Sequence, residues 1–445
     1  MITAYLLLAC CQEVFVDDEY AFKLTPPTGW DRKSVVREGT PVAALWVRPS
    51  TDSRSKDAPP DFTVRRIMTG WPSSMEELQG NVSAYLKEHY TDGFKELWRS
   101  EEKIGGMPAV LFGAEVRVVR RDEDGKVIGS VDRFIAHGLI QRTLLEHFII
   151  HLSAPPDEAD TYRRVYEEAV RSFGSLEMTP TAEQLAAERR FTDLRPLWAD
   201  SKNALAFDDW FNIQRIVAQA EGAILKEKKG YYHIRTREAD VEGEAGISFE
   251  TRLDLVNLEG AKVVTETSGA FRYNLSFQRA TSKETFTDAQ GRVTRRHEIT
   301  ARTAAGGFAV TRTVQWGDRT FKEEKTVTVP AGTVLTNVQE ILRRSLAARG
   351  RNDYFSRVLY MAEDRVRYET LRVFDVERIE IRGEKHDVRP VHTQREYGAT
   401  VQYEFSTDGS LLREHIGIGT LLMDRTTEED ALKPATIEAP PKKDE

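Results

Sequence analysis

The sequence predicts an α+β fold, with an N-terminal antiparallel sheet covered by helices and a C-terminal curved antiparallel sheet, a half-barrel, around an enclosed or packed helix. The first observation is the length of 445 residues, because longer chains divide once a core exceeds about 250–300 residues. The second is the dominance of runs in which apolar and polar residues alternate, as in half-buried strands. The third is the recurrence of glycine-containing turns between these runs, which is typical of antiparallel hairpins.

The first predicted domain covers residues 17–176. It begins with a predicted strand and turn at 20–30, where the strand halts at Pro26-Pro27 and Gly29, and two further predicted strands follow at 43–48 and 62–68. A helix follows Ser74, since Ser74 and Glu77 have the spacing of a capping box. The apolar face of this helix, which we expect to pack on the sheet, consists of Leu78, Val82, Tyr85, Leu86 and His89.

A meander and a closing helix complete this domain. The alternating runs lie at 109–119, 127–136 and 143–152. Asp124-Gly125 supplies a hairpin turn between the first two runs. A helix starts at Pro155 and ends at Gly174. Its shared face consists of Tyr162, Val165, Tyr166, Ala169 and Phe173.

Residues 17–176 resemble the PsbP-like family. The resemblance rests on the strand and turn from Phe22 to Trp30, the segment Ile104-Gly-Gly-Met-Pro-Ala109, and the helix from Tyr162 to Phe173 that ends in Arg-Ser-Phe. It implies a single sheet covered by helices, and a role as an accessory or envelope protein, since many members are lipoproteins. These motifs mark a fold and not a chemistry.

Two helices are predicted between the domains and at the start of the second one. Residues 177–200 are polar, with Pro180 near the front and Pro196 near the end, and are predicted to form a linker helix. The second domain, 201–432, then begins with a predicted amphipathic helix. Its apolar stripe consists of Phe207, Trp210, Ile213, Val217, Ala220 and Ile224.

Strands dominate the chain from Tyr231 onward. Residues 263–277 alternate with a period of two, which predicts one strand with a dry and a wet face. The dry face consists of Val263, Thr265, Thr267, Gly269, Phe271, Tyr273, Leu275 and Phe277. Arginines spread through the strands are interpreted as solvated sheet faces: Arg295, Arg296, Arg302 and Arg312.

One helix interrupts these strands. Thr336 and Gln339 have capping-box spacing, and Gly350 lies just past the predicted end. Its stripe consists of Val338, Ile341, Leu342, Ser345 and Leu346. This arrangement, with the endings 403–413 and 425–431, is similar to the half-barrel domains of the lipoprotein carriers LolA and LolB. Residues 433–445, rich in Pro, Lys, Asp and Glu, are predicted to be a disordered tail.

Residues 1–16 are interpreted as a signal segment. Leu7-Leu8-Ala9-Cys10 resembles a lipobox, which implies that the Cys10 thiol carries a lipid anchor and that the mature chain begins there. The expected charged start is missing and the apolar run is short, as a start codon placed too far downstream would explain. In the alternative, residues 3–9 form a buried strand and Cys10 and Cys11 are inert core thiols.

No catalytic or cofactor-binding motif is recognised. The nucleophile elbow, P-loop, zinc-protease and dinucleotide patterns are all missing, so no cofactor is predicted. His147 and His151 are four residues apart and share a face, but a catalytic zinc needs a third protein ligand. The acid clusters 17–19 and 428–430 are interpreted as solvated termini, the second also as a helix start after Thr427. No metal site is therefore predicted.

The sequence leaves three function classes open. The first is an accessory or interaction protein of a bacterial envelope, located in the periplasm and lipid-anchored to the outer membrane through Cys10. The second is a carrier of an apolar ligand or lipid, in a pocket lined by Trp210, Phe271, Tyr273, Phe277 and Phe308, which core packing explains equally well. The third is an enzyme whose site is assembled only by folding. The net charge of −8, with no basic surplus on either domain, argues against a nucleic-acid partner.

Overall fold

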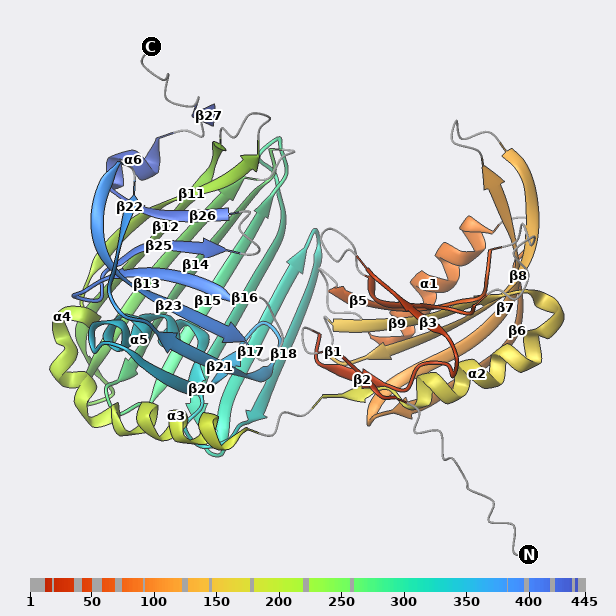
Figure 1. The fold of residues 1–445 in the computed structure, drawn as a ribbon, viewed down its shortest axis with the longest axis horizontal. Helices are drawn as coiled ribbons and strands as arrows, with labels where there is room; N and C mark the ends of the chain where they lie inside the picture. The colour runs from red at the N-terminus through yellow and green to blue at the C-terminus, as the bar shows by residue number, and fades with distance from the viewer. Residues whose placement is uncertain are drawn as a thin grey trace, which may run out of the picture. The chain divides into compact units, whose positions relative to one another are not determined.

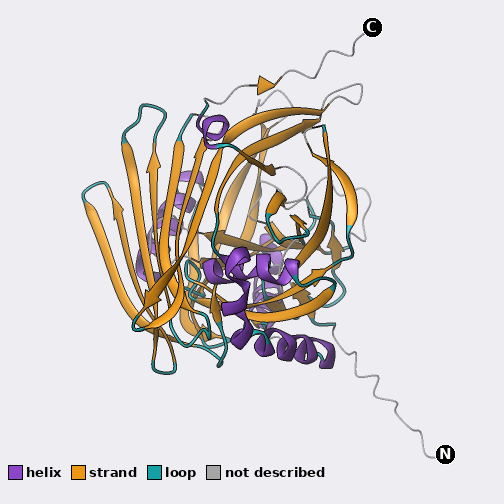
Figure 2. Ribbon diagram, turned by 90° about the vertical axis from the view of Figure 1, so that its left-hand side faces the viewer, coloured by secondary structure: helices purple, strands orange, loops and turns teal. Residues whose placement is uncertain are grey.

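The computed structural model divides the chain into two compact units, unit 1 from Met1 to Glu177 and unit 2 from Met178 to Glu445. Figure 1 draws both units along the chain. The structure describes residues 13–17, 20–35, 42–49, 58–68, 74–90, 93–121, 127–143, 146–176, 180–218, 224–256, 260–381, 383–395, 400–416, 421–433 and 437–438. Strands are far more abundant than helices, as Figure 2 shows, and the fold is a sheet-rich α+β fold.

Unit 1 is built on a seven-stranded antiparallel sheet in the order β3-β4-β5-β9-β8-β7-β6. Its strands are β3 (Asp31–Lys33), β4 (Val42–Val47), β5 (Asp61–Met68), β6 (Lys95–Ile104), β7 (Met107–Arg121), β8 (Val127–Gln141) and β9 (Glu146–Ala154). A second sheet joins β1 (Phe15–Asp17), β2 (Phe22–Leu24) and β10 (Gly174–Ser175). The alternating runs therefore form the predicted antiparallel meander, while β6 was missed because its exposed face is almost wholly polar.

Helices cover both faces of the larger sheet. Helix α1 (Met75–His89) places Leu86 against Ile135, whereas α2 (Ala159–Arg171) packs Tyr166 on the face that carries Phe134. Neighbouring residues of a strand point to opposite faces, so the two helices lie on opposite sides of β8. The capping box between Ser74 and Glu77 is present, as predicted. The predicted turn at Asp124-Gly125 lies outside the described residues.

Unit 2 consists of one long sheet. Its first part is an antiparallel meander of β11 (Asp208–Ala218), β12 (Ile224–Val241), β13 (Glu244–Val256), β14 (Lys262–Arg272), β15 (Gln278–Thr287), β16 (Val293–Ala304), β17 (Gly307–Trp316) and β18 (Arg319–Thr328). The second part comprises β19 (Val334–Leu335), β20 (Asn352–Tyr360), β21 (Arg365–Val373), β22 (Glu377–Ile381), β23 (Glu384–Arg395), β24 (Val401–Ser406), β25 (Leu411–Ile416), β26 (Leu421–Thr426) and β27 (Ile437–Glu438). Strand β26 pairs with β11 and joins the two parts.

The sheet of unit 2 remains open. Among the described residues, β18 pairs only with β17 at one edge, and β19 pairs only with β20 at the other. Helix α5 (Thr336–Ala348) packs inside this sheet, because Tyr232 of β12 donates a hydrogen bond to Glu340 while Leu342 and Leu346 join a core cluster with residues of β20 and β24. The predicted packed helix is thus present, with its apolar stripe buried.

The segment expected to link the domains is part of the core of unit 2. Helix α3 (Ala182–Asp193) begins at a capping box between Thr181 and Gln184, and its Phe191 contacts Trp198 in the short 3-10 helix Arg195–Ser201. Both aromatic side chains are buried in the main core cluster. The polar residues of this segment form its outer face, which explains why composition alone indicated a linker.

The prediction of an amphipathic helix at 207–224 is wrong, because residues 208–218 form strand β11 between β12 and β26. Phe211 and Ile213 point into the core, and Trp210 points the other way onto His233. The apolar residues are spaced as in a helix, but the segment forms a strand because its backbone N–H and C=O groups pair with β12 on one edge and β26 on the other. Residues 219–223 lie outside the described residues.

Two finer predictions in unit 2 are also wrong. Strand β14 ends at Arg272, and a turn containing Leu275 in a left-handed conformation leads back into β15, so 263–277 is not one strand. The capping box of α5 does not form: the N-cap is Leu335 without a side-chain bond, and the Thr336 hydroxyl donates to the Leu359 carbonyl. Because this helix start is buried against β20, the hydroxyl bonds to that strand.

Candidate functional site

The outer face of the meander in unit 2 carries a hollow of about 450 Å³. It lies over β12 to β16, and we refer to it as the arginine hollow. Its lining is rich in guanidinium and hydroxyl groups and consists of Arg235, Arg237, Ser248, Phe249, Glu250, Ser268, Gly269, Arg279, Thr281, Thr300 and Arg302. The volume falls within the range of about 300–1,000 Å³ that is typical of ligand sites.

Strand register explains why these side chains meet. One row across the strands is Arg235, Glu250, Ser268, Thr281 and Thr300, each directly opposite the next. These residues alternate with buried ones such as Ala280 and Ala301, so they point away from the core. The row therefore places a guanidinium, a carboxylate and three hydroxyls in a line across five strands.

A second row lies two residues along each strand. It comprises Arg237, Ser248, Ala270, Arg279 and Arg302, again each opposite the next. Arg279 and Arg302 occupy adjacent strands, about 4.8 Å apart by strand spacing. Like charges directly opposite each other destabilise a sheet. The repulsion between Arg279 and Arg302 therefore destabilises the sheet locally, and a bound anion would reduce this repulsion.

The hollow carries an excess of positive charge. It holds four arginines and one carboxylate, Glu250. Arg235 is neutralised by Asp208 at 2.6 Å, and Arg302 lies 3.6 Å from Glu242. Within the described part of the chain, neither Arg237 nor Arg279 has an ion pair, and both side chains are exposed. Two guanidinium groups are thus available to an anion.

Local packing fixes the floor of the hollow. The Phe249 ring occupies the space above Gly269, where a Cβ atom would lie 2.3 Å from Phe249 Cζ and 2.4 Å from the Arg279 carbonyl oxygen. Glycine within a strand marks such close approach of neighbouring groups. The hydroxyls of Thr281 and Thr300 lie 3.0 Å apart and form a hydrogen bond. These contacts hold the hydroxyl row without using charged groups.

A second hollow of about 330 Å³ adjoins the first, with which it shares Glu250, Ser268 and Thr281. Its charges alternate: Arg252 contacts Glu266 at 2.6 Å and Lys283 lies beside them. At its end, the His233 ring stacks on Trp210 with centroids 3.9 Å apart and contacts Asp208. Burial raises the pKa of Asp208, but the hydrogen bonds from His233 and Arg235 outweigh it, and the pKa lies below its usual value.

The aromatic residues predicted to line an apolar pocket do not all come together. Phe271, Tyr273 and Phe308 belong to the core cluster that surrounds α5. Phe277 lies in a separate small cluster with Val241 and Ala270, where the Arg302 guanidinium sits 5.4 Å from the centre of its ring. Trp210 is half-buried on the outer face. The structure thus unites three of the five and places Phe277 beside the arginine row.

The histidines considered as a metal pair also separate. His147 and His151 share a face of β9, yet it is His137 of β8 that approaches His151, with ring nitrogens 3.2 Å apart. Burial lowers the pKa of His137 and that of His151, the latter to about 3, so these two rings are neutral at pH 7. Throughout the described ranges, no group of three or more His, Cys, Asp or Glu residues is placed to hold a metal ion.

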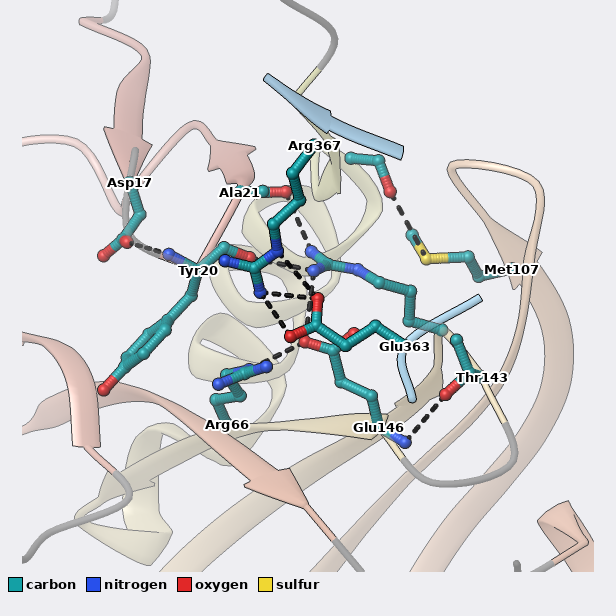
Figure 3. Close-up of polar contacts among 11 residues, drawn as sticks. Asp17, Tyr20, Ala21, Arg66, Met107, Thr143, Glu146, Glu363 and Arg367 are labelled. Carbon is teal, nitrogen blue, oxygen red and sulfur yellow. Dashed lines mark hydrogen bonds and ion pairs between the residues drawn. The ribbon is translucent and has the colours of Figure 1, made fainter. Parts of the chain in front are cut away.

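A buried polar cluster in unit 1 has a structural role (Figure 3). Glu146 is 3% exposed and lies 2.7 Å from Arg66 and 3.2 Å from Arg142. Arg142 in turn donates hydrogen bonds to the carbonyls of Tyr20 and Ala21. The cluster connects the segment between β1 and β2 to the main sheet. The Glu146 carboxylate and the two guanidinium groups are engaged in these contacts.

Other predicted site residues have different outcomes. Cys10 and Cys11 lie outside the described residues, so the lipobox stays a prediction. Asp17 is 2% exposed and accepts a hydrogen bond from the Tyr20 amide, so this acid is not solvated. Helix α6 (Glu428–Leu432) does begin after Thr427, as predicted. In the described ranges, no helix is both long and apolar enough to cross a membrane.

Sequence reasoning missed the arginine hollow. The alternation of its strands marked the residues as outward-facing, and Arg302 was accordingly interpreted as solvated. Only the register between strands aligns Arg279 with Arg302. The same interpretation is wrong for Arg312, which is 1% exposed and contacts Glu323 and Asp364.

Comparisons with known proteins add similarities of fold only. No protein family matches the chain, and no curated protein matches it. Among solved structures, a beta-barrel-like protein of the domain of unknown function DUF1849 from Brucella abortus is similar over 49% of this chain and 93% of its own, at 11% identity and a TM-score of 0.34.

Two further solved structures are similar to this chain. Cyanobacterial PsbP from Synechocystis matches 37% of this chain and 91% of its own, at 15% identity and a TM-score of 0.26. LpqN, described as involved in cell envelope biogenesis of Mycobacterium tuberculosis, matches 35% of this chain and 83% of its own, at 17% identity and a TM-score of 0.25. These TM-scores are low, and no function follows from them.

Proposed function

We propose that this protein is a non-enzymatic accessory protein of a bacterial envelope, anchored to a membrane by a lipid on Cys10, which binds an anionic partner through the arginine hollow. In this proposal unit 1 is a PsbP-like domain and unit 2 a half-barrel whose outer face is the binding surface. The observation that carries the proposal is the pair of exposed arginines Arg237 and Arg279, which form no ion pair with any residue that the structure describes, in a hollow lined by four arginines and one carboxylate.

The chemistry of the hollow favours binding over catalysis. Its lining holds one carboxylate and neither an imidazole nor a thiol. General acid–base work usually needs two titratable groups with different pKa values, or a nucleophile beside a base. Guanidinium groups instead recognise carboxylate and phosphate oxygens through paired hydrogen bonds. The lining therefore suits recognition of an anion.

A carrier of apolar ligands is the second candidate for unit 2. It rests on Phe271, Tyr273 and Phe308, which lie together inside the sheet. The two hollows on the outer face are lined mainly by charged and hydroxyl-bearing residues, which makes an anionic partner the better-supported occupant. Lipid extracted from protein purified out of its native membrane, in amounts equimolar with the chain, would favour the carrier instead.

The proposed function is tested with immobilised dextran sulfate as a general polyanion, at physiological salt. We expect the wild-type protein to bind, and Arg279→Ser with Arg302→Ser to weaken binding at least tenfold, because each lost charge-assisted hydrogen bond is worth about 1.5–3 kcal/mol. The matched control is Arg296→Ser with Arg378→Ser, which removes the same charge from exposed positions outside the hollow. Equal weakening by both pairs would refute a specific site.

A further inference from the structure

We infer that the ligand of the arginine hollow is an anionic oligosaccharide, a chain that carries both acidic groups and free hydroxyls. This inference rests on the proposed function and narrows it to one chemical class. Its basis is the combination of three features in one hollow: a row that contains three arginines, a parallel row that contains three hydroxyls, and an exposed carboxylate, Glu250, which belongs to the hydroxyl row and also lines the second hollow.

Glu250 selects against ligands that are only anionic. Its carboxylate is exposed, and within the described chain it forms no ion pair with another side chain. An ionised carboxylate accepts hydrogen bonds and cannot donate them. A polyphosphate would bring further negative charge to Glu250, whereas a sugar hydroxyl would donate to it. The site therefore fits a ligand that has donors as well as anionic groups.

The hydroxyl row provides matching partners for a sugar. Ser268, Thr281 and Thr300 occupy adjacent strands and lie opposite one another, so their hydroxyls follow one line across the sheet. Each hydroxyl both donates and accepts. The Thr281 and Thr300 hydroxyls lie 3.0 Å apart and bond to each other, which leaves one O–H donor and several acceptor lone pairs of this pair for the ring hydroxyls of a carbohydrate. An anionic lipid headgroup without alcohol hydroxyls, such as that of phosphatidic acid, would use only the arginines.

The spacing of the arginines indicates an extended ligand. Arg237 lies on β12 and Arg279 on β15, three strand spacings apart, which is about 14 Å. A ligand that lies along the sheet and contacts both residues above their own strands spans four strands. Arg302 is held in place by its contact with the Phe277 ring and lies next to Arg279. A chain that runs across the strands from Arg237 to Arg302 would place acidic groups at both ends.

The test compares binding of four probes to the full-length protein: an oligouronate, polyphosphate, neutral dextran, and vesicles containing phosphatidic acid. We expect the oligouronate to bind most tightly and dextran not to bind. Glu250→Gln is the decisive variant. It should weaken oligouronate binding roughly tenfold, because a charged acceptor is lost, and it should strengthen polyphosphate binding.

Glu324→Gln is the matched control, since Glu324 is an exposed carboxylate on the same sheet and outside both hollows. It should leave oligouronate binding unchanged. If polyphosphate or the vesicles bind tighter than the oligouronate, and Arg279→Ser with Arg302→Ser abolishes that binding, the sugar inference is overturned while the anion-binding function stands. If none of the three anionic probes binds, both fail.

Discussion

Asp209 of β11 and Arg344 of α5 form an ion pair in the interior of unit 2, with Asp209 Oδ2 and Arg344 Nη1 2.6 Å apart. The two side chains are 1% and 5% exposed. Arg425 of β26 contacts the other oxygen of Asp209, and the Arg344 guanidinium lies over the Phe207 ring. One buried carboxylate thus connects the helix to the two strands that join both parts of the sheet.

Asp209→Ala is expected to lower the free energy of unfolding of unit 2 by about 3–5 kcal/mol, because it leaves the buried Arg344 without its carboxylate. Urea unfolding measures this loss. Glu298→Ala is the control: it removes an exposed pair with Lys283 and should cost less than about 1 kcal/mol. A similar loss of unfolding free energy in both variants would show that the buried ion pair stabilises unit 2 no more than the exposed pair does.

The stability of unit 1 is expected to fall as the pH drops. Burial lowers the pKa of His137 and of His151 in the folded chain, the latter to about 3. The unfolded chain has the ordinary histidine value near 6.5 and therefore binds more protons below it. The stabilisation is complete above pH 6.5 and is lost as the pH falls from 6.5 towards 3, by up to about 1.4 kcal/mol per pH unit for each histidine.

Urea unfolding of wild type and of His151→Gln between pH 7 and pH 4 checks this pH dependence. The variant should show a shallower fall, since one titrating group is gone. His233→Gln is the control, because this histidine lies in unit 2 and contacts Asp208. The same slope in wild type and His151→Gln would contradict the assignment.

Gly269→Ala is expected to destabilise unit 2 by about 1–3 kcal/mol and to weaken ligand binding. The new methyl group would meet both the Phe249 ring and the Arg279 carbonyl oxygen, and a backbone oxygen within a paired strand cannot move aside. Thermal unfolding and dextran sulfate binding report the two effects. Gly80→Ala in helix α1 is the control, since nothing lies near the added methyl, and it should stabilise unit 1 by about 0.5–1 kcal/mol.

Cys10→Ala is expected to release the protein from membranes when the gene is expressed from its native locus. The lipid on Cys10 would be the anchor, and a chain of net charge −8 has little attraction to anionic lipids. Fractionation of cells expressing wild type, Cys10→Ala and Cys11→Ala measures the effect, and Cys11→Ala should stay with the membrane. Membrane retention of Cys10→Ala, or a mature N-terminus at another residue, would contradict the lipobox.

Local patterns in the sequence were sufficient to predict an element where the interactions that form it join residues close together in the chain. The capping box at Ser74 and Glu77 predicted the start of α1, because both bonds join residues three apart. The alternation at 109–119 likewise predicted β7, and the stripe of Val338 and Ile341 predicted a buried helix. In each case the signal lies within one or two turns or within a single strand.

The sequence by itself determined that strands dominate, that a buried helix interrupts them in unit 2, and that residues such as Arg302 face outward, whereas it gave the wrong direction for Arg312. Only the tertiary structure decided that 208–218 is a strand, because its two neighbours β12 and β26 come from distant parts of the chain. The tertiary structure also determined the position of the arginine hollow. Arg237, Arg279 and Arg302 are far apart in sequence, and the hairpin registers that align them depend on turns whose geometry the alternating pattern does not encode.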